Sequence, residues 1–187
     1  MTIDQLKNVA IGHWESIAVE IRPGSSKNTD GTLKPFYLTR NFILTHEDKF
    51  ELIVTNYADP VGKIPLAKMS IRGHIEWRGE HPITLGAQKV DFVADEEYTV
   101  TPLLQRFADV LNQYTKGYPE WKVGETQSIF KKAFVPFGLS EGQVFKEYDL
   151  IYVFDNMMYW GARNIDGRGF DKEENRPTNL QIPMIRR

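Results

Sequence analysis

Hydrophobic and polar residues alternate strictly between Ala67 and Trp77, which is the clearest pattern in the chain. Met69, Ile71 and Ile75 fall on the apolar side of this run, and the polar residues fall between them. A period of two is typical of a β-strand with one buried face and one solvated face. We therefore expect residues 67–77 to form a strand whose apolar face turns towards the interior.

Several other segments have strand-like patterns separated by turn signals. Residues 37–44 and 50–57 form an expected hairpin around Glu47-Asp48-Lys49. Residues 17–22 alternate in the same way, with Ile17, Val19 and Ile21 on the apolar side. The remaining expected strands are residues 89–94, 97–100, 145–154 and 157–160, and Asp155-Asn156 between the last two tolerates the positive φ of a hairpin turn.

One segment has helical periodicity instead. Leu103, Phe107 and Val110 recur at helical spacing within residues 101–114, where Thr101 can cap the helix and Pro102 suits its first position. About eight short strands with one α-helix predict a mainly β, antiparallel fold that closes into a β-barrel, because closure removes exposed sheet edges. No linker rich in Pro, Gly or Ser divides the chain, so we expect a single domain over residues 1–187.

Composition and charge narrow the class of function. The 187 residues are 41% hydrophobic and carry a net charge of −2 at pH 7. No stripe of Lys and Arg could neutralise a run of phosphates, so nucleic acid is not an expected partner. Cysteine is absent, residues 1–12 do not resemble a secretory signal, and no apolar run approaches the ~20 residues of a membrane span. These features favour a cytoplasmic protein without membrane insertion.

Known catalytic and cofactor-binding motifs are missing from the sequence. His13, His46, His74 and His81 lack the i, i+3 or i, i+4 spacing of a helical metal site, so we expect no metal. The G-x-S-x-G elbow, the phosphate loop and the dinucleotide fingerprint do not occur, so we expect no cofactor.

Arg40 lies between Leu38 and Phe42 on one face of its expected strand. If that face points inward, its guanidinium must be paired, because an unpaired buried charge is strongly destabilising, and Glu20 is the expected partner. Three interpretations stay open: a structural salt bridge, exposure at the surface, or bidentate binding of a ligand carboxylate by Arg40.

Gly12-His13-Trp14 is a G-x-W triplet that resembles the start of a lipocalin-type (calycin-type) barrel. In such barrels the Trp closes one end, and an arginine from a late strand packs over it. The resemblance implies a structural role for Trp14 and for Arg163, which would lie over the Trp14 ring in a cation–π contact.

A longer series of motifs resembles the adenomatosis polyposis coli down-regulated family. The series runs through Trp14-Glu15-Ser16, Glu20-Ile21-Arg22-Pro23-Gly24, Tyr37-Leu38-Thr39-Arg40-Asn41-Phe42, Tyr57-Ala58-Asp59-Pro60, Val100-Thr101-Pro102, Trp121-Lys122-Val123-Gly124, Gly161-Ala162-Arg163, Arg176-Pro177 and Gln181-Ile182-Pro183. The resemblance implies a lipocalin-like barrel with an apolar cavity, associated in the animal members with lipid-modified Wnt ligands and signalling inhibition. Val19 and Gly62 stand where the secreted members would carry cysteines, so we expect a cysteine-free, intracellular, microbial relative.

The leading hypothesis for function is a binding module that holds an apolar small molecule inside the barrel, such as a lipid, an acyl chain or a terpenoid- or polyketide-like compound. Desolvation would drive binding at about 25 cal/mol per Å² of apolar surface. The residues expected to contact the ligand are Phe42, Val54, Met69, Ile71, Ile75, Trp77, Phe92, Tyr148 and Tyr152.

Two other functions remain open. In a cofactor-free isomerase, cyclase or dehydratase acting on such a molecule, Tyr37, Glu20 and Arg40 would be the acid/base or orienting groups. A protein-interaction module would be favoured by a filled interior together with an exposed apolar patch. The sequence also leaves a homo-oligomer open.

Overall fold

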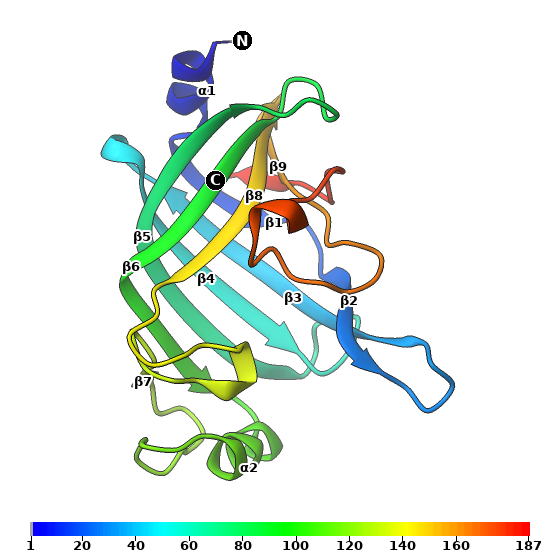
Figure 1. Cartoon of the computed structure of the whole chain (residues 1–187), viewed down its shortest axis with the longest axis vertical. Helices are drawn as coiled ribbons and strands as arrows, with labels where there is room; N and C mark the ends of the chain where they lie inside the picture. Colours follow the sequence, from blue (N-terminus) through cyan, green and yellow to red (C-terminus); the bar gives the residue numbers. More distant parts are fainter. Residues whose placement is uncertain (1) are drawn as a thin grey trace.

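Ten β-strands form one sheet in which each strand pairing is antiparallel (Figure 1). The computed structural model describes residues 2–187. The strands are β1 (Gly12–Ser16), β2 (Glu20–Lys27), β3 (Leu33–Leu44), β4 (Lys49–Tyr57), β5 (Pro65–Glu80), β6 (Gln88–Pro102), β7 (Gln127–Ser128), β8 (Phe145–Phe154), β9 (Met157–Trp160) and β10 (Met184–Arg186). The α-helices are α1 (Ile3–Ala10) and α2 (Gln105–Tyr114), and the short 3₁₀ turns are η1 (His46–Asp48), η2 (Val135–Phe137) and η3 (Glu173–Asn175).

The strand order makes the hydrogen-bonded path return to its starting point. The order is β1-β10-β9-β8-β6-β5-β4-β3-β2, and β1 also pairs with β3. Strand β3 is therefore shared, since its residues 41–44 pair with β1 and its residues 33–38 pair with β2. The prediction of a mainly β, antiparallel fold is confirmed.

The best-predicted strands are those with a strong period of two and a defined turn. Tyr37 lies opposite Tyr57 and Leu44 opposite Phe50, as the predicted hairpin requires. Strands β8 and β9 have the predicted bounds, and the turn residues Asp155 and Asn156 have φ values of 49° and 57°. These positive φ values match the twist of a two-residue hairpin.

The alternation predicted for residues 17–22 has the opposite phase in the structure. Glu20 and Arg22 are 3% and 8% exposed, whereas Ile17 and Ile21 are 49% and 63% exposed. The prediction was wrong because the inward side of β2 carries an ion-pair network that stabilises buried polar groups. Residues 89–94 and 97–100 also join into the single strand β6, with an irregularity in its pairing with β5 where a turn was expected.

The expectation of one helix beginning near Thr101 was wrong in two respects. Thr101 and Pro102 still belong to β6, and the amide of Leu103 still bonds to the Leu66 carbonyl, so α2 begins later. The second helix, α1, is fixed by a capping box in which the Thr2 hydroxyl accepts from the Gln5 amide and the Gln5 side chain accepts from the Thr2 amide. Figure 1 shows the two helices at opposite ends of the sheet.

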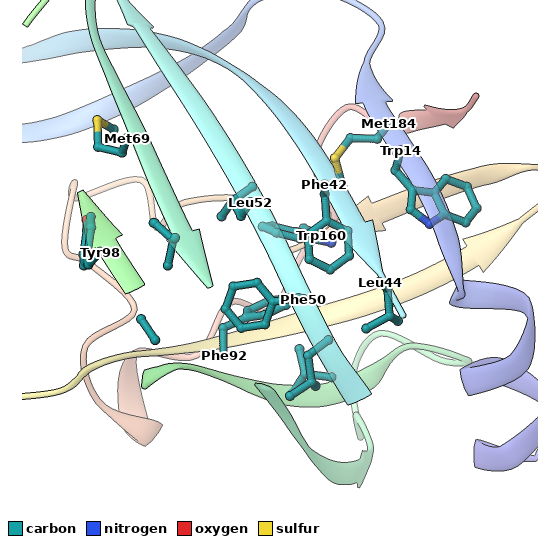
Figure 2. Close-up of a cluster of buried hydrophobic side chains, with 14 of the residues drawn as sticks. Trp14, Phe42, Leu44, Phe50, Leu52, Met69, Phe92, Tyr98, Trp160 and Met184 are labelled. Atoms are coloured by element: carbon teal, nitrogen blue, oxygen red, sulfur yellow. The ribbon is translucent and has the colours of Figure 1, made fainter. Parts of the chain in front are cut away.

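The inward faces of the strands meet in one apolar core (Figure 2). Phe42, Phe92 and Trp160 form its aromatic centre, with Trp160 4.9 Å from Phe42 and 4.5 Å from Phe92 between ring centroids. Edge-on and tilted contacts of this kind favour a solid, well-ordered interior. The core therefore fills the part of the ring that includes β1, β9 and β10.

Residues 161–183, called the strap below, cross from the end of β9 to the start of β10 and contact β2 and β8. The Tyr148 amide of β8 donates to the Phe170 carbonyl at 2.8 Å, and Arg22 of β2 donates to Gln181 Oε1 at 2.7 Å. Arg176 anchors the strap, because its guanidinium donates to the Val90 and Asp149 carbonyls and to Asp91.

Candidate ligand cavity

A cavity of about 760 Å³ lies on the inward side of β2 to β6 and β8, next to the filled core. Its size falls within the ~300–1,000 Å³ of typical small-molecule sites. The lining residues are Arg22, Gly24, Ser25, Ser26, Lys34, Pro35, Phe36, Leu38, Arg40, Leu52, Val54, Asn56, Met69, Ile71, Tyr98, Pro136, Phe137, Gly138, Phe145, Lys146, Glu147, Trp160, Arg163, Gly169, Phe170 and Asp171.

One wall of the cavity is apolar. It is formed by Leu52 and Val54 of β4 and by Met69 and Ile71 of β5. Three aromatic rings continue this wall, with Tyr98 stacked on Phe137 at 6.0 Å and edge-on to Phe145 at 5.5 Å between centroids. Burial raises the pKa of the Tyr98 hydroxyl, so this group stays neutral.

The opposite side of the cavity contains buried charges. Glu20 Oε2 accepts from Arg22 Nε at 3.0 Å, and Glu20 Oε1 accepts from Arg40 Nε at 2.8 Å. Burial acts against ionisation of Glu20, but the two guanidinium groups outweigh it and lower the pKa of this carboxyl. The predicted partnership between Glu20 and Arg40 is confirmed.

Arg40 uses only one edge of its guanidinium in this pair. Nε bonds to Glu20, and Nη2 lies 2.7 Å from the same carboxylate oxygen, although at an angle that does not make a good hydrogen bond. Nη1 is buried and has no acceptor within residues 2–187. The guanidinium carbon lies 4.2 Å from the centre of the Trp160 ring, which supports the charge from one face.

Two further carboxyl groups, Glu147 and Asp149, point inward from β8. Asp149 Oδ1 accepts from the backbone amides of Leu150 and Gly161 at 2.7 and 2.8 Å. Burial and the neighbouring Glu147 raise the pKa of Asp149 to about 7. Burial also raises the pKa of Glu147, against the opposing influence of Arg22, Arg40 and Arg163.

The strap completes the cavity between β2 and β8. Gly169, Phe170 and Asp171 contribute to the lining, together with Arg163. Arg163 donates from Nε and Nη2 to the Gly167 carbonyl at 3.1 and 2.9 Å. The strap therefore forms one wall of the cavity from loop residues, and the Arg163 guanidinium holds this loop at Gly167.

The residues predicted to contact a ligand fall into three groups. Val54, Met69 and Ile71 line the cavity. Phe42, Ile75 and Phe92 belong to the filled core next to it. Trp77, Tyr148 and Tyr152 contact other parts of the structure.

Each member of the third group has a different partner. Trp77 Nε1 donates to Asp48 Oδ1 at 2.8 Å, at the α1 end of the core. Tyr148 lies beneath the Arg176 guanidinium, 5.4 Å from ring centre to carbon. Tyr152 is stacked on the exposed ring of Phe154 on the outside of β8.

The three candidate acid/base residues do not meet at one point. Glu20 and Arg40 are in contact, and Arg40 lines the cavity. Strand alternation places Tyr37 on the opposite face of β3 from Arg40, and Tyr37 is not among the lining residues.

Trp14 has an arginine over its ring, but it is not Arg163. The guanidinium carbon of Arg186 lies 4.2 Å from the centre of the Trp14 ring, whereas that of Arg163 lies 5.2 Å from Phe36. The predicted contact was wrong because β10 pairs with β1 and places Trp14 directly opposite Arg186.

Sequence reasoning missed several residues of the polar side. Arg22 and Glu147 were not among the candidates, yet both line the cavity. For Glu147 a signal existed, because it shares the face of Ile151 and Val153 on a strand with a period of two. The strap residues gave no such signal, since loops have no periodicity.

Within residues 2–187, no three His, Asp or Glu side chains gather as a metal site, and neither helix is long and apolar enough to cross a membrane. Val19 and Gly62 lie side by side, since a Cβ added to Gly62 would be 2.8 Å from Val19 Cγ2. A family model described as Adenomatosis polyposis coli down-regulated 1 matches residues 1–133, which include β1 to β7 and both α-helices.

Proposed function

The chain belongs to the Adenomatosis polyposis coli down-regulated 1 family, and from this premise we propose that it is a binding module for an apolar small molecule. In this proposal the sheet closes as a lipocalin-like barrel around the ligand. The return of the strand path through β1 and β3 supports such closure.

The observation that carries the proposal is the cavity of about 760 Å³ beside the aromatic core, with an apolar wall formed by β4 and β5. Its volume is that of a typical small-molecule site, and its apolar wall suits an apolar occupant. A lipid, an acyl chain or a terpenoid- or polyketide-like molecule would gain about 25 cal/mol for each Å² of apolar surface that it buries.

Uptake of a neutral apolar dye such as Nile red tests the proposal. Val54 lines the cavity, whereas its neighbour Ile53 is 40% exposed on the outer face of the same strand. We expect Val54→Trp to narrow the cavity and weaken dye binding by about tenfold or more, and Ile53→Trp to leave binding unchanged.

Native mass spectrometry of the protein purified from its own host provides the second measurement. A retained lipid or related apolar molecule is the expected result. The absence of any retained ligand, together with no dye uptake by the unmodified protein, would overturn the proposal.

A further inference from the structure

The polar side of the cavity carries an excess of positive charge. Arg22, Arg40 and Arg163 all line it, and Glu20 lies between the first two. The cation of Lys146 is directed elsewhere, because its Nζ lies 2.8 Å from Glu76 and 3.0 Å from Asp91 on the outer face. Lys34 and Asp171, which also line the cavity, add one charge of each sign.

The Glu147 carboxyl is the acidic group that faces these arginines from β8, but it does not neutralise them directly. Within residues 2–187 it forms no hydrogen bond and no ion pair within 4.0 Å. Burial raises its pKa, against the opposing influence of Arg22, Arg40 and Arg163. Its neighbour Asp149 has a raised pKa for the same reason.

Arg40 shows where a ligand oxygen is needed. The residue is 4% exposed, and its Nη1 and Nη2 are buried donors without a hydrogen-bond acceptor in the part of the chain that the structure describes. An unsatisfied buried donor costs free energy that an incoming acceptor would recover, and an anionic acceptor recovers more than a neutral one. Glu20 occupies only the edge of the guanidinium that carries Nε, so N–H donors of Nη1 and Nη2 on the other edge remain for ligand oxygens.

Building on the proposed function, we propose that the cavity takes an elongated monocarboxylic acid with its head group inward. The carboxylate accepts from Arg40 Nη1 and is further stabilised by Arg22 and Arg163. Its hydrocarbon chain lies along the apolar wall formed by Leu52, Val54, Met69 and Ile71.

Displacement of Nile red by three ligands with the same C16 chain tests this head-group assignment. The ligands are hexadecanoate, hexadecanol and hexadecyltrimethylammonium, each used below its micelle concentration at pH 8. We expect hexadecanoate to bind about tenfold or more tightly than hexadecanol, and the cationic ligand to bind most weakly.

Substitutions separate the carboxylate contact from general uptake. Arg40→Gln should weaken hexadecanoate binding about tenfold or more and hexadecanol binding much less, so that the preference for hexadecanoate is lost. Arg72→Gln is the matched control, because Arg72 is half-exposed on the outer face of β5, paired with Glu97 at 2.9 Å. This control should keep the full preference.

Glu147→Gln provides a test that does not disturb the Glu20–Arg40 pair. It removes a negative charge facing the arginines and preserves the shape of the side chain, so hexadecanoate should bind more tightly and its advantage over hexadecanol should grow. If the dye and hexadecanol bind but hexadecanoate has no advantage, or if Glu147→Gln changes neither affinity, this inference is overturned and the proposed function stands. If no C16 ligand and no dye binds, both are overturned.

Discussion

Glu20 and Arg40 join β2 to β3 through a buried ion pair, with Nε–Oε1 and Nη2–Oε1 distances of 2.8 and 2.7 Å. The side chains are 2% and 3% exposed, so both charges have lost most of their hydration. Glu20 lies opposite Leu38 in the strand register and reaches diagonally to Arg40. The pair therefore fixes which face of β2 turns inward, and Arg40 Nη1 and Nη2 are buried without a hydrogen-bond acceptor within residues 2–187.

Glu20→Gln should lower the free energy of unfolding by about 3 to 5 kcal/mol, because it leaves the buried guanidinium groups of Arg22 and Arg40 without their counter-charge. Glu15→Gln is the control, since Glu15 pairs with Arg187 at the exposed surface and should change stability by about 1 kcal/mol or less. Urea denaturation measures both. Equal effects of the two substitutions would show that the buried pair has no special structural role.

Arg186→Gln should destabilise the protein by about 2 kcal/mol, since it removes the cation–π contact with the fully buried Trp14 and a hydrogen bond to the Ile11 carbonyl at 2.7 Å. The adjacent Arg187 makes only an exposed ion pair, so Arg187→Gln should have little effect. Thermal unfolding of the two variants measures the difference. A similar loss from both would contradict the assignment of Arg186 as the residue that covers Trp14.

The strands could be predicted wherever the relevant forces are local. The turn at Asp155-Asn156 depends on neighbours in sequence, and the bounds predicted for the two strands that it joins, residues 145–154 and 157–160, were correct. The inward face of β2 depends on an ion pair with β3, so its residues alternate in the expected period but with the opposite phase. The choice between Arg163 and Arg186 depends likewise on the pairing of the three-residue strand β10 with β1.

The cavity could be predicted only in part, because apolar residues on one strand face have the same pattern whether they line a space or fill a core. Met69 and Ile75 share the inward face of β5 and both belong to the core, yet only Met69 lines the cavity. The boundary between the cavity and the rest of the core lies at Trp160 of β9, which lines the cavity and packs against the rings of Phe42 and Phe92. Such a boundary arises from tertiary packing and has no periodic signature.

Gly167→Ala should destabilise the strap, because Gly167 has φ 79° and a Cβ there would collide with the Gly24 carbonyl of β2. Gly117 has the same φ of 79° with open space around it. Gly117→Ala should therefore lower the free energy of unfolding by about 1 kcal/mol, through the strained backbone conformation alone. Amide hydrogen exchange should therefore show faster exchange at the Phe170-bonded Tyr148 amide in Gly167→Ala alone. Equal exchange in both variants would mean that the strap does not contact β2 closely in solution.

The last prediction concerns the buried carboxyl of Asp149. Burial and the neighbouring Glu147 raise the pKa of this group to about 7. Between the ordinary pKa of an aspartate and this value, the folded protein binds a proton that the unfolded chain has lost. Stability from this group therefore falls as pH rises towards 7. His81 acts in the opposite direction, since burial lowers its pKa and the unfolded chain binds the extra proton. The difference in the free energy of unfolding between an Asp149 variant and the unmodified protein is thus more informative than the pH profile of either protein alone.

Asp149→Asn keeps an oxygen that can accept from the Leu150 and Gly161 amides but cannot ionise. We expect its free energy of unfolding to be closest to that of the unmodified protein near pH 4, to exceed it increasingly up to about pH 7 and to exceed it by a constant amount from there to pH 8, because only the carboxyl must ionise in the interior. Asp30→Asn is the control, since hydrogen bonds from Thr32 lower the pKa of the exposed Asp30 below this range and its difference from the unmodified protein should stay constant. A constant difference for Asp149→Asn as well would show that Asp149 is already ionised throughout, and the inward side of β8 would then carry a permanent negative charge facing the arginines.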